Sequence, residues 1–77
     1  MAIYIQMRRK EEDASGAVYE FGPIDEMIGS VFISRELREV SLLHIDDPKK
    51  TEFYLARVTR ALQKEKGEFP PSAVYAA

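Results

Sequence analysis

The chain contains no cysteine and no tryptophan, and only one of its 77 residues is a histidine. Without cysteine it has no disulfide, no thiolate metal site and no cysteine nucleophile. Long hydrophobic runs are also missing, so the sequence predicts neither a signal peptide nor a membrane span. These absences favour a reducing compartment, and we expect a cytoplasmic protein stabilised by its own core or by a partner chain.

Neither sign of charge dominates, because 11 Lys and Arg stand against 13 Asp and Glu. The isoelectric point near 5.4 lies far below the value above about 9 expected of a nucleic-acid-binding domain. The distribution is uneven, since residues 11–47 carry a net charge of −8 and residues 49–66 carry +4. Either the basic segment lies across the acidic part of the same fold, or each segment faces a partner of opposite charge.

Alternating apolar and polar residues predict strands in the first part of the chain. We expect the first strand around residues 3–7, the second over residues 17–21 and the third over residues 30–34. The polar run at residues 10–16 is typical of a hairpin loop. Pro23, after the second strand, suits the start of a short helical turn and fits a plain loop nearly as well.

Residues 35–45 fit two structures. One is a turn over residues 35–38 followed by a strand from about Glu39. The other is a helix capped by Ser34, because apolar residues also recur at helical spacing. We prefer the strand, since a much better helix start follows directly.

That start is Asp46-Asp47-Pro48, which combines capping carboxylates with a proline at the first helical position. The sequence predicts a helix from Pro48 to about Lys66, with Gly67 in the left-handed conformation that ends many helices. Its apolar stripe should cover a sheet. The stripe consists of Thr51, Tyr54, Leu55, Val58, Ala61 and Leu62.

Together these elements predict one α+β domain over residues 1–77: an antiparallel three- to four-stranded β-meander, one long C-terminal helix packed on one face and an extended C-terminal tail. The tail carries large apolar side chains, so we expect it to dock on the domain or on a second copy. The predicted core is Ile3, Ile5, Met7, Tyr19, Phe21, Val31, Ile33, Leu43, Leu55, Val58 and Leu62.

The sheet face away from the helix is too apolar to stay entirely bare. We expect the tail to cover it, or, if the tail goes elsewhere, a second subunit or another protein. The predicted face comprises Tyr4, Gln6, Arg8, Val18, Glu20, Ser30 and Phe32.

Three short segments stand out along the chain: residues 19–23 (YEFGP), residues 67–70 (GEFP) and residues 75–77 (YAA). In this order, around a hairpin and a helix, they resemble a pattern in small uncharacterised bacterial proteins. The resemblance spans most of the chain and implies a bacterial, cytoplasmic source. It implies no activity and no catalytic residue.

His44 is followed by Asp46 and Asp47, the one cluster of a histidine and carboxylates in the sequence. A structural zinc site usually has four protein ligands and a catalytic one three, which this chain would complete only with further carboxylates. The simpler interpretation is that the aspartates cap the helix. We therefore predict no catalytic, cofactor-binding or metal-ligating residue, and a small enzyme or metal protein using His44 stays an alternative.

The predicted helix carries a basic face away from its apolar stripe, formed by Lys50, Arg57, Arg60 and Lys64 with Phe53 among them. Such a face suits a phosphate backbone and a stacked base, or an acidic protein surface. A solvated face that balances the acidic middle of the chain is the plainer explanation.

The leading hypothesis is a non-enzymatic protein-protein interaction module, with a protein partner or a homodimer and with no membrane. An immunity- or antitoxin-like inhibitor is one concrete version, because a small acidic fold can mask a basic active site. A nucleic-acid-binding protein using the basic helix face is the main alternative. The predicted partner-binding residues are Tyr4, Arg8, Phe32, Phe53, Arg57, Arg60 and Lys64.

Overall fold

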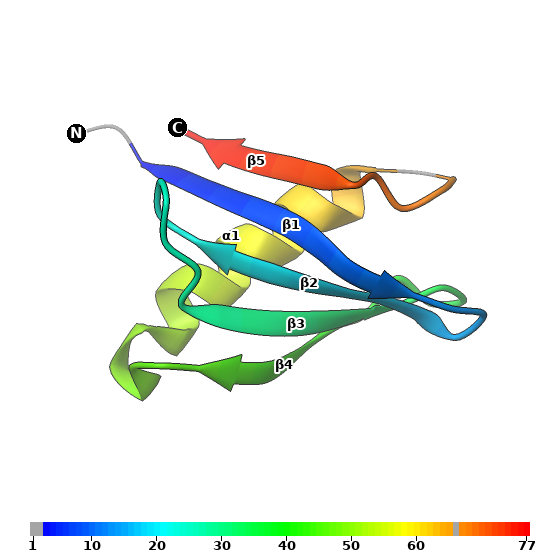
Figure 1. Ribbon diagram of the computed structural model, residues 1–77, viewed down its shortest axis with the longest axis horizontal. Helices are drawn as coiled ribbons and strands as arrows, with labels where there is room; N and C mark the ends of the chain where they lie inside the picture. The colour runs from blue at the N-terminus through cyan, green and yellow to red at the C-terminus, as the bar shows by residue number, and fades with distance from the viewer. Residues whose placement is uncertain (1–2, 66) are drawn as a thin grey trace.

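The computed structural model describes residues 3–65 and 67–77, in which five strands form one antiparallel sheet (Figure 1). The strands are β1 (Tyr4–Glu12), β2 (Gly16–Gly22), β3 (Gly29–Ser34), β4 (Val40–Ile45) and β5 (Ser72–Ala76), in the spatial order β4-β3-β2-β1-β5. A 3₁₀ turn, η1 (Pro48–Lys50), leads into the helix α1 (Thr51–Lys64). The predicted α+β fold is confirmed, with one strand more than expected because the tail is itself a strand.

The helix α1 packs on one face of the sheet and crosses it from the β4 side to the β5 side (Figure 1). Inward side chains from β1, β2 and β3 alternate with outward ones, as the period-two pattern predicts. Ile3 and Leu55 are only partly buried. The core consists of Ile5, Met7, Ala17, Tyr19, Phe21, Ile28, Val31, Ile33, Val58, Ala61, Leu62 and Phe69.

The core prediction is wrong for Leu43, whose side chain is 55% exposed. Val31 pairs with Leu42 and Ser30 pairs with His44, so Leu43 is the extra residue of a β-bulge. The bulge leaves Leu43 outside and returns Ile45 to the side that packs against the core. Strand alternation alone cannot reveal such an insertion.

Segments between the strands differ in detail from the prediction. β1 continues to Glu12 through an irregularity between Arg9 and Glu11, so the hairpin loop is shorter than residues 10–16. Pro23 starts a turn and not a helix, with the Glu26 N–H donating to the Pro23 carbonyl oxygen at 3.2 Å. Residues 35–45 form a turn followed by β4, which confirms the strand and excludes the helix.

The helical segment begins at Pro48, as the sequence predicts, with the 3₁₀ turn η1 as its first turn and α1 following from Thr51. The Asp47 carboxylate accepts a hydrogen bond from the Lys49 N–H at 3.1 Å, and Pro48 occupies the first position. α1 ends at Lys64, two residues early, because Glu65 is already extended. The predicted last helical residue, Lys66, lies outside the described residues.

The C-terminal tail pairs with β1 along the edge of the sheet, with Ile5 opposite Tyr75 and Met7 opposite Ala73. Before this strand, Phe69 is buried in the core, and the Tyr19 hydroxyl donates to the Pro70 carbonyl oxygen at 2.5 Å. The tail thus docks on the domain, as expected. It does not cover the open face of the sheet, which corrects the preferred expectation.

Replacing Phe69 by alanine should lower the free energy of unfolding by about 3 kcal/mol or more, because a buried ring is lost and a cavity remains. Leu43→Ala is the matched control, and its cost should stay below about 1 kcal/mol because the side chain is mostly in solvent. Urea unfolding measures both. Equal losses in the free energy of unfolding for the two variants would contradict both the buried position of Phe69 and the bulge at Leu43.

Candidate interaction surfaces

The open face of the sheet is the surface away from α1, and β5 extends it beyond the predicted strands. The pairing of β1 with β5 places Tyr4 opposite Ala76, and Gln6 opposite Val74. Tyr4 is 43% exposed and Val74 is 50% exposed, while Phe32 is partly buried on the same face. Large apolar side chains therefore remain in contact with solvent on this face.

The centre of the open face is polar and carries both signs of charge. Arg8 of β1 lies directly opposite Glu20 of β2, and Glu20 lies opposite Ser30 of β3. Opposite charges at paired positions favour this register. The structure therefore places Tyr4, Arg8 and Phe32, three predicted partner-binding residues, on one surface.

A hollow of about 230 Å³ opens where the β1–β2 hairpin ends, with Val18 and Phe32 beside acidic side chains. Glu12 forms ion pairs with Arg9 at 3.0 Å and with Arg35 at 2.7 Å. This carboxylate is therefore engaged in holding the hairpin to the neighbouring turn.

Asp13, also in the wall of this hollow, organises the hairpin loop. Its Oδ1 atom accepts hydrogen bonds from the Ser15 hydroxyl at 2.6 Å, the Ser15 N–H at 2.8 Å and the Gly16 N–H at 3.2 Å. These hydrogen bonds, with that from the Ser15 hydroxyl foremost, hold the pKa of Asp13 below its ordinary value. Two carboxylates of the acidic hairpin thus have structural roles.

The outer face of α1 carries the other predicted partner-binding residues. Phe53 is 41% exposed, but the Arg57 guanidinium lies 4.0 Å from the centre of its ring and donates to the Phe53 carbonyl oxygen at 2.9 Å. This cation–π contact covers one side of the ring. Phe53 is therefore less open to base stacking than the sequence pattern suggests.

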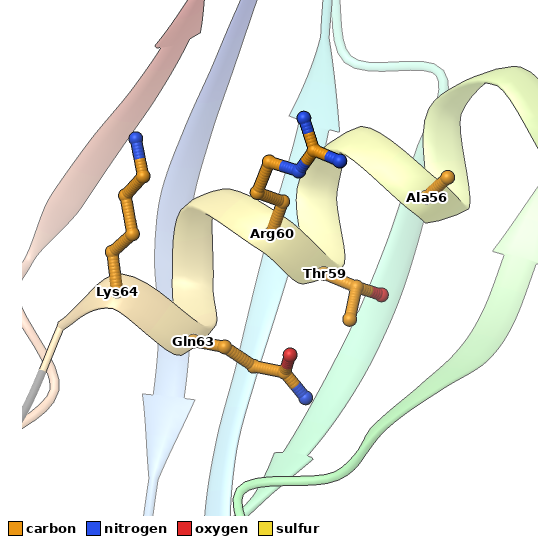
Figure 2. Close-up of a pocket in the computed structure, with 5 residues that line it drawn as sticks. All are labelled: Ala56, Thr59, Arg60, Gln63 and Lys64. Carbon is orange, nitrogen blue, oxygen red and sulfur yellow. The ribbon is translucent and has the colours of Figure 1, made fainter.

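Further along α1, Arg60 and Lys64 are exposed and point to the same side of the helix, away from Gln63 and Thr59 (Figure 2). A shallow hollow of about 380 Å³ lies among these side chains and Ala56. Lys50 precedes α1 in the 3₁₀ turn. The seven predicted residues therefore form two surfaces on opposite sides of the sheet and no single site.

Asp46 does not cap the helix but contacts His44, with His44 Nε2 2.9 Å from Asp46 Oδ1, and both side chains are exposed. Asp47 instead caps the helix. Among the residues that the structure describes, no three histidine or acidic side chains are grouped so that they could hold a metal ion. The His44 hypothesis thus has a pair of side chains and no third ligand.

One cluster escaped the sequence analysis. The guanidinium groups of Arg35 and Arg38 lie 4.9 and 4.4 Å from the centre of the Phe69 ring, and Arg38 donates to the Gly67 carbonyl oxygen. Arg9 donates to the Phe69 carbonyl oxygen at 2.7 Å. No local pattern links residues so far apart in the chain, and their contacts anchor the start of the tail.

Comparison with protein-family models, with curated proteins and with solved structures found no match. In the part of the chain that the structure covers, no helix combines the length and the apolar character needed to cross a membrane. The surfaces themselves are therefore the basis for a functional proposal.

The hydrogen bonds of Asp13 predict a pH-dependent stability. Asp13→Ala should lower the melting temperature at neutral pH, because three hydrogen bonds to a carboxylate are lost. A lowered folded-state pKa stabilises the fold above the ordinary value of 3.8, and this contribution is lost as the pH falls through the folded-state pKa. The difference in melting temperature between wild type and Asp13→Ala should therefore narrow as the pH falls below 3.8. Thermal unfolding at a series of pH values would show this.

Glu11→Ala removes a neighbouring charge and serves as the control. If the difference in melting temperature between wild type and Asp13→Ala stayed constant across the acid range, the proposed role of the ionised Asp13 carboxylate would be contradicted.

Proposed function

We propose that this protein is a non-enzymatic protein–protein interaction module that forms a homodimer through its open sheet face. The main support is the position of the tail, which was expected to cover this face and instead lengthens the sheet. Tyr4 and Val74 are left half exposed on a surface to which five strands contribute. An antiparallel sheet with one bare, partly apolar face is a common docking surface.

The charges on this face suit a second copy of the chain. A two-fold axis running along the strands between β1 and β2 would place each β1 over β2 of the other copy. Arg8 would then face Glu20 of the second copy, and the same contact would occur twice because a two-fold interface is reciprocal. Complementary charge favours this arrangement over a random encounter.

The area of the open sheet face limits the affinity that we expect for the homodimer. Five strands spaced about 4.8 Å apart, with about 6 residues each, cover a flat footprint of about 500 Å². Standard interfaces bury about 800 Å² on each partner. We therefore expect a weak dimer that dissociates on dilution.

The other functional hypotheses have less structural support. An inhibitor that masks a basic site would need free carboxylates, whereas two of the three at residues 11–13 are engaged, Glu12 by Arg9 and Arg35 and Asp13 by its own loop. Base stacking by the helix face would need an open aromatic ring, whereas Arg57 stacks on Phe53. Both stay predictions.

Tyr4→Glu should shift the protein to the monomer, because it places a charge on the apolar part of the interface. Sedimentation velocity from about 10 μM to about 1 mM, the range in which weak dimers dissociate, measures this. Leu37→Glu is the control, since Leu37 is 67% exposed in the turn before β4 and lies off the sheet. A wild-type protein that stays monomeric at the highest concentration would contradict the homodimer.

A further inference from the structure

β5 lies at the edge of the sheet, and its outer backbone groups have no strand beside them. The Ile3 N–H donates to the Ala77 carbonyl oxygen at 2.9 Å, and the Ala77 N–H donates to the Ile3 carbonyl oxygen at 3.0 Å. In an antiparallel ladder such reciprocal pairs alternate with residues whose N–H and C=O point away from the neighbour. Ser72, Val74 and Ala76 therefore direct these groups outward, and within residues 3–65 and 67–77 no further strand pairs with them.

This edge lacks the features that usually prevent strand addition, which are charged side chains, proline and bulges. Residues 72–76 carry no charge and no proline, and their pairing with β1 is regular. The opposite edge, β4, is interrupted by the bulge at Leu43. The two edges thus differ, and β5 is the one suited to accept another strand.

A groove of about 380 Å³ runs between β5 and the C-terminal half of α1. Residues 73–76 form one wall, and Arg60, Ala61, Lys64 and Glu65 form the other. The small Ala61 side chain in this wall is buried, whereas those of Arg60 and Lys64 are exposed. An extended peptide beside β5 would therefore lie within reach of the helix.

The groove is positively charged overall. Arg60 and Lys64 are exposed, and no ion pair holds either of them in the described part of the chain, while Glu65 is the one acidic side chain in the lining. A second copy paired through β5 would bring both sets of cations toward the same two-fold axis, where they repel. An acidic peptide segment beside β5 would instead meet the opposite charges of Arg60 and Lys64.

We propose that this groove binds an extended acidic peptide of another protein, which adds a sixth strand beside β5. Backbone hydrogen bonds to Ser72, Val74 and Ala76 provide affinity, and carboxylates near Arg60 and Lys64 provide selectivity. The site shares β5 with the open sheet face but uses the backbone edge of that strand and the side that faces α1, so it does not depend on the homodimer.

A capped synthetic peptide of alternating Glu and Val is the probe, and the same peptide with Lys in place of Glu is its control. Titration of ¹⁵N-labelled protein should shift the amide resonances of Ser72, Val74 and Ala76 with the acidic peptide only. Binding should weaken as salt is added, because the charges are exposed. Equal shifts with both peptides, or shifts confined to other strands, would overturn the proposal.

The charges are tested by Arg60→Glu combined with Lys64→Glu, which should weaken binding by at least about tenfold. Lys49→Glu combined with Lys50→Glu changes the net charge equally at the other end of the helix, and its affinity should stay within about twofold of wild type. An equal loss of affinity in the two double variants would show that only the net charge of the protein matters. That result would contradict peptide binding at this groove.

The backbone contribution is tested by Val74→Pro, which removes an outward N–H and leaves the bonds to β1 intact. Binding should be lost while the melting temperature stays close to that of Val74→Ala, the control that keeps the N–H. Retained binding by Val74→Pro would exclude strand addition.

Two further measurements distinguish peptide binding at the groove from homodimer formation through the open face. Tyr4→Glu should bind the peptide like wild type, because Tyr4 lies outside the groove. In Tyr4→Glu, whose open face should no longer dimerise, concentration-dependent shifts of the β5 amides without peptide would show that a second copy occupies the edge, and that result would overturn the peptide proposal.

Discussion

The pairing of β5 with β1 is the constraint on which the remaining structure depends. It joins the two ends of the described chain, with Ile3 and Ala77 bonded to each other. Closing so long a loop costs conformational entropy. Burial of Phe69 and the hydrogen bond from Tyr19 to Pro70 offset that cost, because both are made only when the tail is in place.

This pairing determines which surfaces are available. A tail folded over the sheet would bury the open face and leave β1 as the edge. A tail beside β1 leaves the face bare and creates a new edge next to α1 (Figure 1). Both proposed binding surfaces are thus consequences of one placement, even though they lie on different sides of the sheet and suit different partners.

The sequence predicted what depends on local periodicity and missed what depends on distant contacts. Alternation placed Tyr19 and Val31 inside, and both are fully buried. It failed at Leu43, because a bulge is set by pairing with the neighbouring strand. Tyr4, Arg8 and Phe32 share a face because of the same alternation, whereas the groove beside β5 needs the strand order, which no local pattern contains.

The uneven charge of the chain had two explanations, and the contacts of α1 bear on both. Within the described residues, the ion pairs join Arg9 and Arg35 to Glu12, His44 contacts Asp46, and none of these contacts involves α1. The basic segment therefore does not neutralise the acidic one through direct contacts. α1 packs on the sheet through its apolar side, and two of its cations, Arg60 and Lys64, are exposed to solvent. Arg60 and Lys64 are thus free to interact with a molecule of opposite charge, and the adjacent uncharged strand edge favours one that arrives in an extended conformation.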